Sequence, residues 1–170
     1  GLLVTNERYE DLRQAGIGDI NGILALIEPL ERAEILVRRS REQLELEIGH
    51  FTIQERDGMV VACSAFYPYR QEQVAELACL AVHPEYRNQG RGDRLLRHTE
   101  DLAQGQGIRG LFVLTTQTAH WFRERGFIPL SLDELPVTRQ RLYNYRRNAL
   151  VLYKDLPGKD RSGKDRAGDQ

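Results

Sequence analysis

The sequence predicts an α/β fold with a mixed central sheet flanked by helices. Three observations lead to this expectation. Helical patterns come first, strand patterns follow across residues 51–82, and the rest alternates strand, helix, strand, helix, strand. A hairpin signal, Asp57-Gly58, separates two of the strands, and a glycine-rich turn leads from a third strand into a helix. With 170 residues, one domain is the natural expectation.

The first helix is expected to begin at Asp19, which can cap it with its carboxylate. Its apolar face comprises Ile20, Ile23, Leu24 and Ile27. Pro29 should end or kink this helix, because proline lacks the N–H that a helix interior needs. Residues 30–37 then form a linker or a second helical turn.

A second helix is expected from Ser40, since Ser40 and Gln43 have the spacing of a capping box. Gly49 should close this helix. Beyond it, alternating and apolar runs predict strands at 51–56, 59–67 and 74–82, with a polar loop at 68–73.

The last part of the chain continues the alternation of helix and strand. Gly105 and Gly107 should end the helix after the glycine-rich turn, and Gly126 should stop a short one. The expected segments are a strand at 111–116, a helix at 119–125, extended chain at 127–129, a loop at 132–136, helical turns at 138–142 and a strand at 149–153.

Composition excludes several function classes. The net charge of −1 argues against a general nucleic-acid or acidic membrane surface. No apolar run approaches membrane-spanning length and no signal peptide is visible, so we expect a cytoplasmic protein. Cys63 and Cys79 lie in apolar runs and are expected to be buried free thiols. No Cys/His cluster has metal-ligand spacing, so we expect no metal.

The glycine-rich turn is Arg-Asn-Gln-Gly-Arg-Gly at 87–92. Glycine lets a ligand approach the backbone closely, and the positive end of the following helix suits a pyrophosphate. A P-loop would need Gly-Lys-Ser/Thr, and Gly92-Asp93-Arg94 lacks it. A dinucleotide fingerprint would need a third glycine where Arg94 and Leu95 stand. A plain strand-to-helix turn remains the alternative.

The hexapeptide resembles the Arg/Gln-x-x-Gly-x-Gly loop of the GCN5-related N-acetyltransferases, which holds the pyrophosphate of acetyl-CoA. Residues 111–127, Leu-Phe-Val-Leu-Thr-Thr-Gln-Thr-Ala-His-Trp-Phe-Arg-Glu-Arg-Gly-Phe, resemble the strand, helix and Gly-Phe ending that follow this loop. Residues 35–44, 76–84 and 135–148 look like one branch, the bacterial N-acetylglutamate synthases. The resemblance implies the acetyltransferase fold, with a mixed and mostly antiparallel sheet.

This resemblance also implies a domain layout. We expect the acetyltransferase domain at 18–156 and a disordered charged tail at 157–170. The synthases carry an N-terminal domain like the amino-acid kinases, for which this sequence has neither length nor pattern. Residues 1–17 are therefore interpreted as a linker or a remnant of it. We expect homo-oligomers, above all in proteins that carry this N-terminal domain.

The resemblance further implies transfer of the acetyl group of acetyl-CoA to the α-amine of L-glutamate, the first step of arginine biosynthesis. Glu76 would be the general base, and Thr115 would donate to the departing thiolate. The alternatives are a solvated strand-end carboxylate for Glu76 and an ordinary strand residue for Thr115. Many acetyltransferases use a tyrosine where this chain has Phe122, a departure that favours Thr115.

Binding residues follow from the same resemblance. Arg39 and Arg147, with Arg139 as a third candidate, would hold the carboxylates of glutamate, because forked guanidinium groups match carboxylates. A covalent role for Cys79 is disfavoured, since no His or Asp stands at activating spacing. Acetyl-CoA would contact Cys79, Leu80, Ala81, Val82, Arg87, Asn88, Gln89, Gly90, Arg91, Gly92 and Asp93.

Two other functions remain open at this point. The same fold can acetylate another amine, such as a polyamine, a drug or a protein N-terminus. A non-catalytic acyl-CoA sensor or assembly module is the alternative from a different class.

Overall fold

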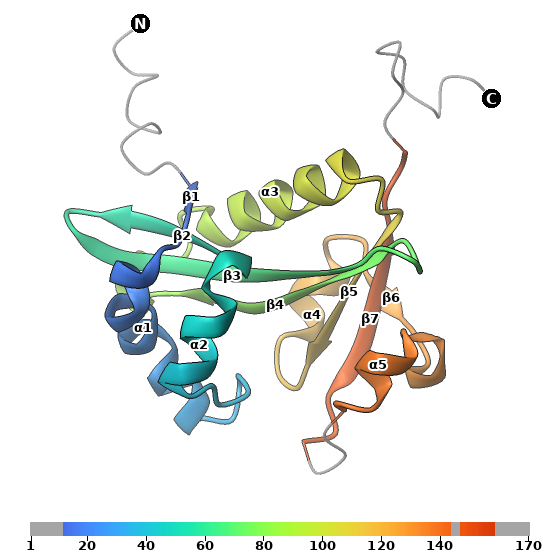
Figure 1. The fold of residues 1–170 in the computed structure, drawn as a ribbon, viewed down its shortest axis with the longest axis horizontal. Helices are drawn as coiled ribbons and strands as arrows, with labels where there is room; N and C mark the ends of the chain where they lie inside the picture. Colours follow the sequence, from blue (N-terminus) through green and yellow to red (C-terminus); the bar gives the residue numbers. More distant parts are fainter. Residues whose placement is uncertain (1–11, 144–146, 159–170) are drawn as a thin grey trace, which may run out of the picture. The chain divides into compact units, whose positions relative to one another are not determined.

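A computed structural model describes residues 12–143 and 147–158 (Figure 1). Its seven strands are hydrogen-bonded in the order β1-β2-β3-β4-β5-β7-β6, and the sheet is mixed and mostly antiparallel, as predicted. The strands are β1 Leu12–Gln14, β2 Phe51–Arg56, β3 Met59–Tyr69, β4 Val74–Val82, β5 Gly110–Thr115, β6 Ile128–Pro129 and β7 Leu150–Asp155. The α-helices are α1 Ile20–Arg32, α2 Arg41–Glu47, α3 Arg91–Gly105, α4 Ala119–Arg123 and α5 Val137–Gln140.

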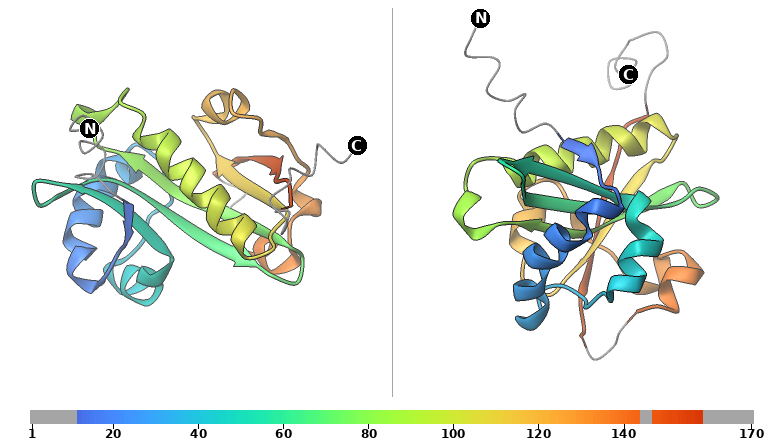
Figure 2. Two further views of the ribbon diagram at one scale, coloured as in Figure 1. Left: turned by 90° about the horizontal axis from the view of Figure 1, so that it is seen from above. Right: turned by 60° about the vertical axis from the view of Figure 1, so that its left-hand side comes forward.

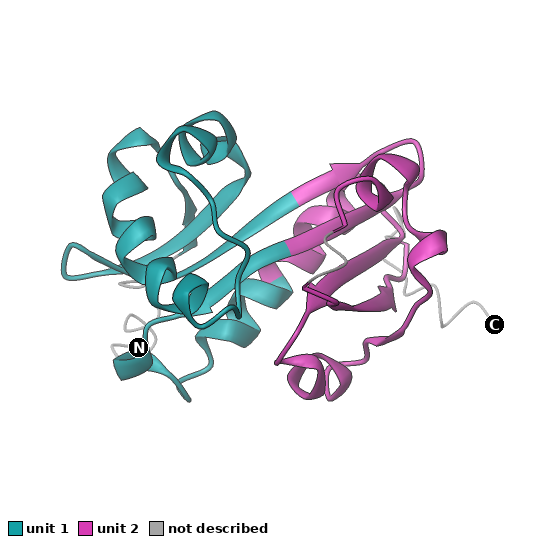
Figure 3. Ribbon diagram, turned by 90° about the horizontal axis from the view of Figure 1, so that it is seen from below, with its two compact units in different colours: residues 1–66, 78–97 teal, residues 67–77, 98–170 magenta. Residues whose placement is uncertain are grey.

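The described chain forms two compact units (Figure 3). Unit 1 consists of residues 1–66 and 78–97, and unit 2 of residues 67–77 and 98–170. Among the described residues, no helix is long and apolar enough to cross a membrane. The expectations for residues 1–11 and 159–170 concern residues outside those that the structure describes, and the domain boundaries stay a prediction.

In unit 1, the predicted hairpin is confirmed. Asp57 and Gly58 have positive φ angles of 53° and 79°, as a two-residue turn between twisted strands requires. The strand before the turn, β2, has the predicted bounds, and β3 runs two residues further than predicted, to Tyr69. In the antiparallel register Phe51 lies opposite Ala65 and Ile53 opposite Cys63, and these side chains are buried.

Helix α1 packs on this hairpin with Ile20, Ile23 and Ile27 fully or almost fully buried. The expected end at Pro29 is wrong, because α1 continues through Pro29 to Arg32. Proline removes one backbone donor, yet its carbonyl still accepts the N–H of Ala33 at 3.1 Å and closes the last turn.

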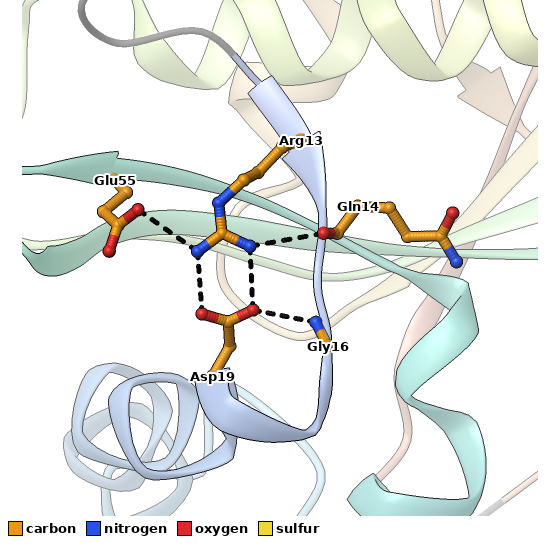
Figure 4. A network of polar contacts seen from close by, with 5 residues as sticks. All are labelled: Arg13, Gln14, Gly16, Asp19 and Glu55. Atoms are coloured by element: carbon orange, nitrogen blue, oxygen red, sulfur yellow. Dashed lines mark hydrogen bonds and ion pairs between the residues drawn. The ribbon is translucent and has the colours of Figure 1, made fainter.

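Asp19 stands at the N-cap of α1 but makes no side-chain cap. Its carboxylate instead accepts two hydrogen bonds from Arg13, at 2.8 and 2.9 Å, and one from the N–H of Gly16 (Figure 4). Arg13 also donates to Glu55. The network joins β1, the start of α1 and β2. Asp19 does not cap α1 as predicted, because its carboxylate binds the charged guanidinium of Arg13 instead.

The capping prediction at Ser40 is confirmed, since Ser40 Oγ accepts the N–H of Gln43 at 3.1 Å. Helix α2 ends at Glu47 rather than at Gly49, because a 3₁₀ turn, Ile48–His50, takes over before β2. Leu44 is its buried residue. Figure 2 shows α1 and α2 side by side in unit 1.

In unit 2, strand β5 is the central element. It pairs in parallel with β4, where Glu76 lies opposite Phe112, and antiparallel with β7, where Thr115 lies opposite Leu150. Phe112 and Val151 pack with Leu135 in a buried cluster. The loop expected at 132–136 contains a 3₁₀ turn, Leu132–Glu134, which brings Leu135 onto these strands.

Candidate active site

The glycine-rich turn follows β4 in unit 1. A 3₁₀ turn, Pro84–Tyr86, leads into it, and Asn88 and Gly90 have positive φ angles of 64° and 82°. A Cβ at Gly90 would meet nothing within 4 Å, so the backbone there is open to a ligand. The first helical bond of α3 runs from the N–H of Arg94 to the carbonyl of Gly90 at 3.0 Å. The turn therefore offers an open backbone at the positive end of a 15-residue helix.

The buried side chain of Arg91 supports this turn through hydrogen bonds. Its residue is 2% exposed, and its guanidinium donates to the carbonyl of Tyr86 at 3.1 Å and to Gln89 Oε1 at 2.6 Å. The same guanidinium lies over the ring of Tyr86 at 5.0 Å. The side chain of Arg91 thus holds a backbone carbonyl and a side chain of the segment that leads into α3.

Cys79 has a positive φ of 54° within β4, a backbone conformation that is strained for a residue other than glycine. Both cysteines are buried and free, as expected. Cys63 Sγ donates to the carbonyl of Cys79 at 3.4 Å. The interaction with Cys79 and burial raise the pKa of Cys63 well above its usual value, so Cys63 stays a thiol at neutral pH.

Arg39 lies directly before the N-cap of α2 and is half-buried. Its N–H donates to the carboxylate of Glu31 at 2.9 Å, and its guanidinium donates to the carbonyl of Val37 at 3.3 Å. The neighbouring Arg38 and Arg41 are exposed, as single arginines ordinarily are.

Glu76 is buried in unit 2 rather than solvated at a strand end, so the solvated alternative is wrong. Only 7% of the surface of Glu76 is exposed. Arg139 on α5 donates from Nε to Glu76 Oε1 at 2.6 Å and from Nη2 to Oε2 at 3.2 Å. The predicted base and one of the predicted substrate ligands therefore contact each other directly.

Tyr69 belongs to the surroundings of this pair. Burial raises the pKa of Tyr69, the negative charge of Glu76 raises it further, and Arg139 offsets part of the effect. Its ring lies 6.0 Å from that of Phe112, the residue opposite Glu76 in the sheet. Tyr69 thus remains a neutral phenol at neutral pH.

Thr115 ends β5 and is 6% exposed. Its Oγ1 accepts the N–H of Thr118 at 3.0 Å and shares a 2.6 Å hydrogen bond with Thr118 Oγ1. A hydroxyl has two acceptor sites and one proton. When the Thr118 hydroxyl donates, both acceptor sites of Thr115 are filled, and its own proton is free for another acceptor.

Arg147 is half-buried in the turn before β7, and Arg141 is exposed. Residues 144–146, between these two arginines, are outside the described residues. Phe122, which stands in place of the tyrosine that many acetyltransferases use, is buried and packs edge-on against Phe127 at 5.3 Å. Its phenyl ring carries no hydroxyl, so it cannot donate a proton to the departing thiolate.

Sequence reasoning missed two partners of the site. Thr118 escaped notice although it stands at the N-cap position of α4, where threonine is common, and it makes no cap there. Its position three residues after Thr115 is the sequence feature that indicates a contact between the two side chains. No sequence feature indicates the contact between Arg139 and Glu76, because 63 residues separate the two.

Residues 20–127 match the Acetyltransferase (GNAT) family. The chain belongs to this family. The fold is that of a GNAT domain, and the open glycine turn after β4 and the buried Glu76 lie within the matched residues. Within the described residues, no group of three or more His, Cys, Asp or Glu side chains could hold a metal ion.

Several relatives of one kind are similar to most of this chain. The chain is 57% identical to the amino-acid acetyltransferases of Pseudomonas paraeruginosa (strain DSM 24068 / PA7) and of Azotobacter vinelandii (strain DJ / ATCC BAA-1303), each over 156 residues. These matches cover 92% of this chain and 36% of each relative. The chain thus spans about a third of the length of the relatives it matches.

Among solved structures, the chain is similar to N-acetylglutamate synthase from Neisseria gonorrhoeae complexed with coenzyme A and N-acetyl-glutamate. The TM-score is 0.83 at 48% identity, over 86% of this chain and 35% of that one. The resemblance to the bacterial synthases is thereby confirmed.

Proposed function

We propose that this GNAT chain transfers the acetyl group of acetyl-CoA to the α-amine of L-glutamate, the first step of arginine biosynthesis, in the cytoplasm. The supporting observation is the 48% identity to a synthase solved with coenzyme A and N-acetyl-glutamate. The acyl donor would lie with its pyrophosphate at the turn of residues 87–93 and with its pantetheine arm along the backbone of residues 79–82. The open backbone at Gly90 suits such a ligand.

The reaction forms a bond between the amine nitrogen and the thioester carbon and breaks the bond between that carbon and sulfur. An ammonium is no nucleophile, so a base must first take a proton. Glu76 fits this role, since it is a buried carboxylate with acceptor sites beyond the two that Arg139 fills. The departing thiolate receives a hydrogen bond or a proton from Thr115, whose acceptor sites can both be filled by Thr118.

The two carboxylates of glutamate need cationic partners. Arg39 and Arg147 are proposed as these ligands, because both are only half-buried and arginine matches a carboxylate with two donors. Losing such a charge-assisted contact costs on the order of 2 kcal/mol, which is about a thirtyfold loss of affinity.

The test is acetyl transfer by the purified chain across glutamate, glutamine, aspartate and spermidine, with Glu76→Gln as the variant. We expect glutamate to be the preferred acceptor and glutamine to be poor, because it lacks the second charge. Glu76→Gln should lower kcat on the order of a hundredfold or more with little change in coenzyme A affinity.

Each of the following results would contradict part of this proposal. Preference for spermidine, or equal use of glutamine, would assign a different acceptor. Coenzyme A binding without turnover of any acceptor would point to a binding module. Near-normal turnover by Glu76→Gln would show that Glu76 is not the base, and the assignment of glutamate as the acceptor would stand.

A further inference from the structure

The contact between Arg139 and Glu76 is nearly closed to water. The exposed fractions of the two side chains are 14% and 9%. A buried carboxylate without a partner is strongly unfavourable, and removal of one member of such a pair leaves the other charge uncompensated. Departure of Arg139 from Glu76 would therefore be costly at every stage of a reaction.

The geometry of the contact restrains the carboxylate as well as neutralising it. Two different nitrogens of Arg139 donate to the two different oxygens of Glu76. A two-point contact between planar groups fixes the plane of the carboxylate, whereas a single contact would let it rotate. Each oxygen keeps a further acceptor site for an ammonium or a water.

The backbone that carries Arg139 is itself anchored. Gln140 Nε2 donates to the carbonyls of Asp133 and Leu135, at 3.1 and 2.6 Å. Leu135 is 4% exposed and packs against Phe112, the residue opposite Glu76 in β5. Both ends of the ion pair are thus fixed to the same strand of unit 2.

We propose that Arg139 is a positioning residue that holds the Glu76 carboxylate in place for catalysis, and that it does not serve as a ligand of the amino-acid substrate. This inference rests on the proposed function and reassigns the third candidate among the substrate arginines. Arg39 and Arg147 then remain as carboxylate ligands.

The two roles of Arg139 predict different kinetics. A positioning residue acts on Glu76, so its loss changes kcat. A substrate ligand would instead change the KM for glutamate.

The experiment compares Arg139→Gln and Arg139→Lys with Arg141→Gln, which removes an exposed charge from the same segment. We expect Arg139→Gln to lower kcat on the order of a hundredfold, with both KM values changed less than about threefold. Arg139→Lys, which keeps the charge but not the two-point contact, should lose less. Arg141→Gln should behave as the unmodified chain.

A double variant measures the coupling between Arg139 and Glu76. Because Arg139 acts through Glu76, Glu76→Gln combined with Arg139→Gln should be no slower than Glu76→Gln alone. Thermal melting and coenzyme A titration show whether each variant folds. If Arg139→Gln does not fold, Arg139→Lys provides the test.

Three outcomes would overturn the inference. The first is a raised glutamate KM with unchanged kcat. The second is full activity of a folded Arg139→Gln chain while Glu76→Gln is inactive, which refutes the role of Arg139 but not the proposed function. The third is additive losses in the double variant.

Discussion

Burial of Glu76 changes what this residue can do. On a solvated strand end, a carboxylate would exchange freely among water partners. In this chain, the Glu76 carboxylate is buried and held by one guanidinium. Its remaining acceptor sites are few and directed, which is the condition for proton transfer from a positioned amine.

Thr115 allows a prediction at the same scale. Thr115→Val keeps the branched shape but removes the hydroxyl, so the departing thiolate loses its donor. We expect kcat to fall on the order of a hundredfold while coenzyme A affinity is retained. Thr115→Ser, which restores the hydroxyl and its contacts with Thr118, should recover most of this loss. The check is steady-state kinetics beside coenzyme A titration, and equal activity of the valine and serine variants would exclude a hydroxyl role.

At the scale of elements, a single backbone conformation shapes the turn before α3. Gly90 has a φ of 82°, a region that other residues adopt at a cost of about 1 kcal/mol. Helix α3 begins directly after it, and the first helical carbonyl is that of Gly90 itself. Any distortion at Gly90 therefore reaches the helix end that would face an anion.

Gly90→Ala should weaken coenzyme A binding and lower the melting temperature slightly. The reason is the strained φ together with a methyl group in the open space above the turn. Calorimetric titration measures the affinity. Gly105→Ala is the matched control, because Gly105 ends the same helix in open space without a positive φ. Unchanged affinity in a folded Gly90→Ala chain would remove this turn from the binding site.

The junction of β1, α1 and β2 gives a prediction on stability. The hydrogen bonds from Arg13, supported by the N–H of Gly16, lower the pKa of Asp19 against the opposing effect of partial burial. A carboxyl with a lowered pKa stabilises the fold above its unfolded pKa of about 4, and the contribution disappears as pH falls through the lower folded value. The contribution is modest because Arg13 is 45% exposed.

Arg13→Met should therefore lower the free energy of unfolding by about 1 kcal/mol at pH 7. The difference from the unmodified chain should shrink below about pH 4, where the carboxyl becomes protonated. Urea denaturation at pH 7 and at pH 3 measures both values. Arg38→Met, at an exposed arginine of the same unit, controls for loss of a charge. A difference that is independent of pH would show that Asp19 is not responsible.

For the whole molecule, local signals predicted most elements. The cap at Ser40 and the Asp57-Gly58 turn need only neighbouring residues, and both were confirmed. Asp19 was misjudged because Arg13, outside the helix, competes for its carboxylate. The pairing of Arg139 with Glu76 joins distant segments, which no local pattern encodes. The family resemblance predicted which residues to examine, and their catalytic and binding roles remain predictions.

The short strand β6 has a consequence for how this chain behaves at high concentration. It consists of Ile128 and Pro129 and stands at the end of the strand order, beside β7. Proline offers no donor to an approaching strand, and the adjoining stretch of β7 ends in Lys154 and Asp155, whose charges oppose close approach of another copy. This side of the sheet is therefore a poor template for strand addition, so it should resist the intermolecular pairing that leads to aggregates.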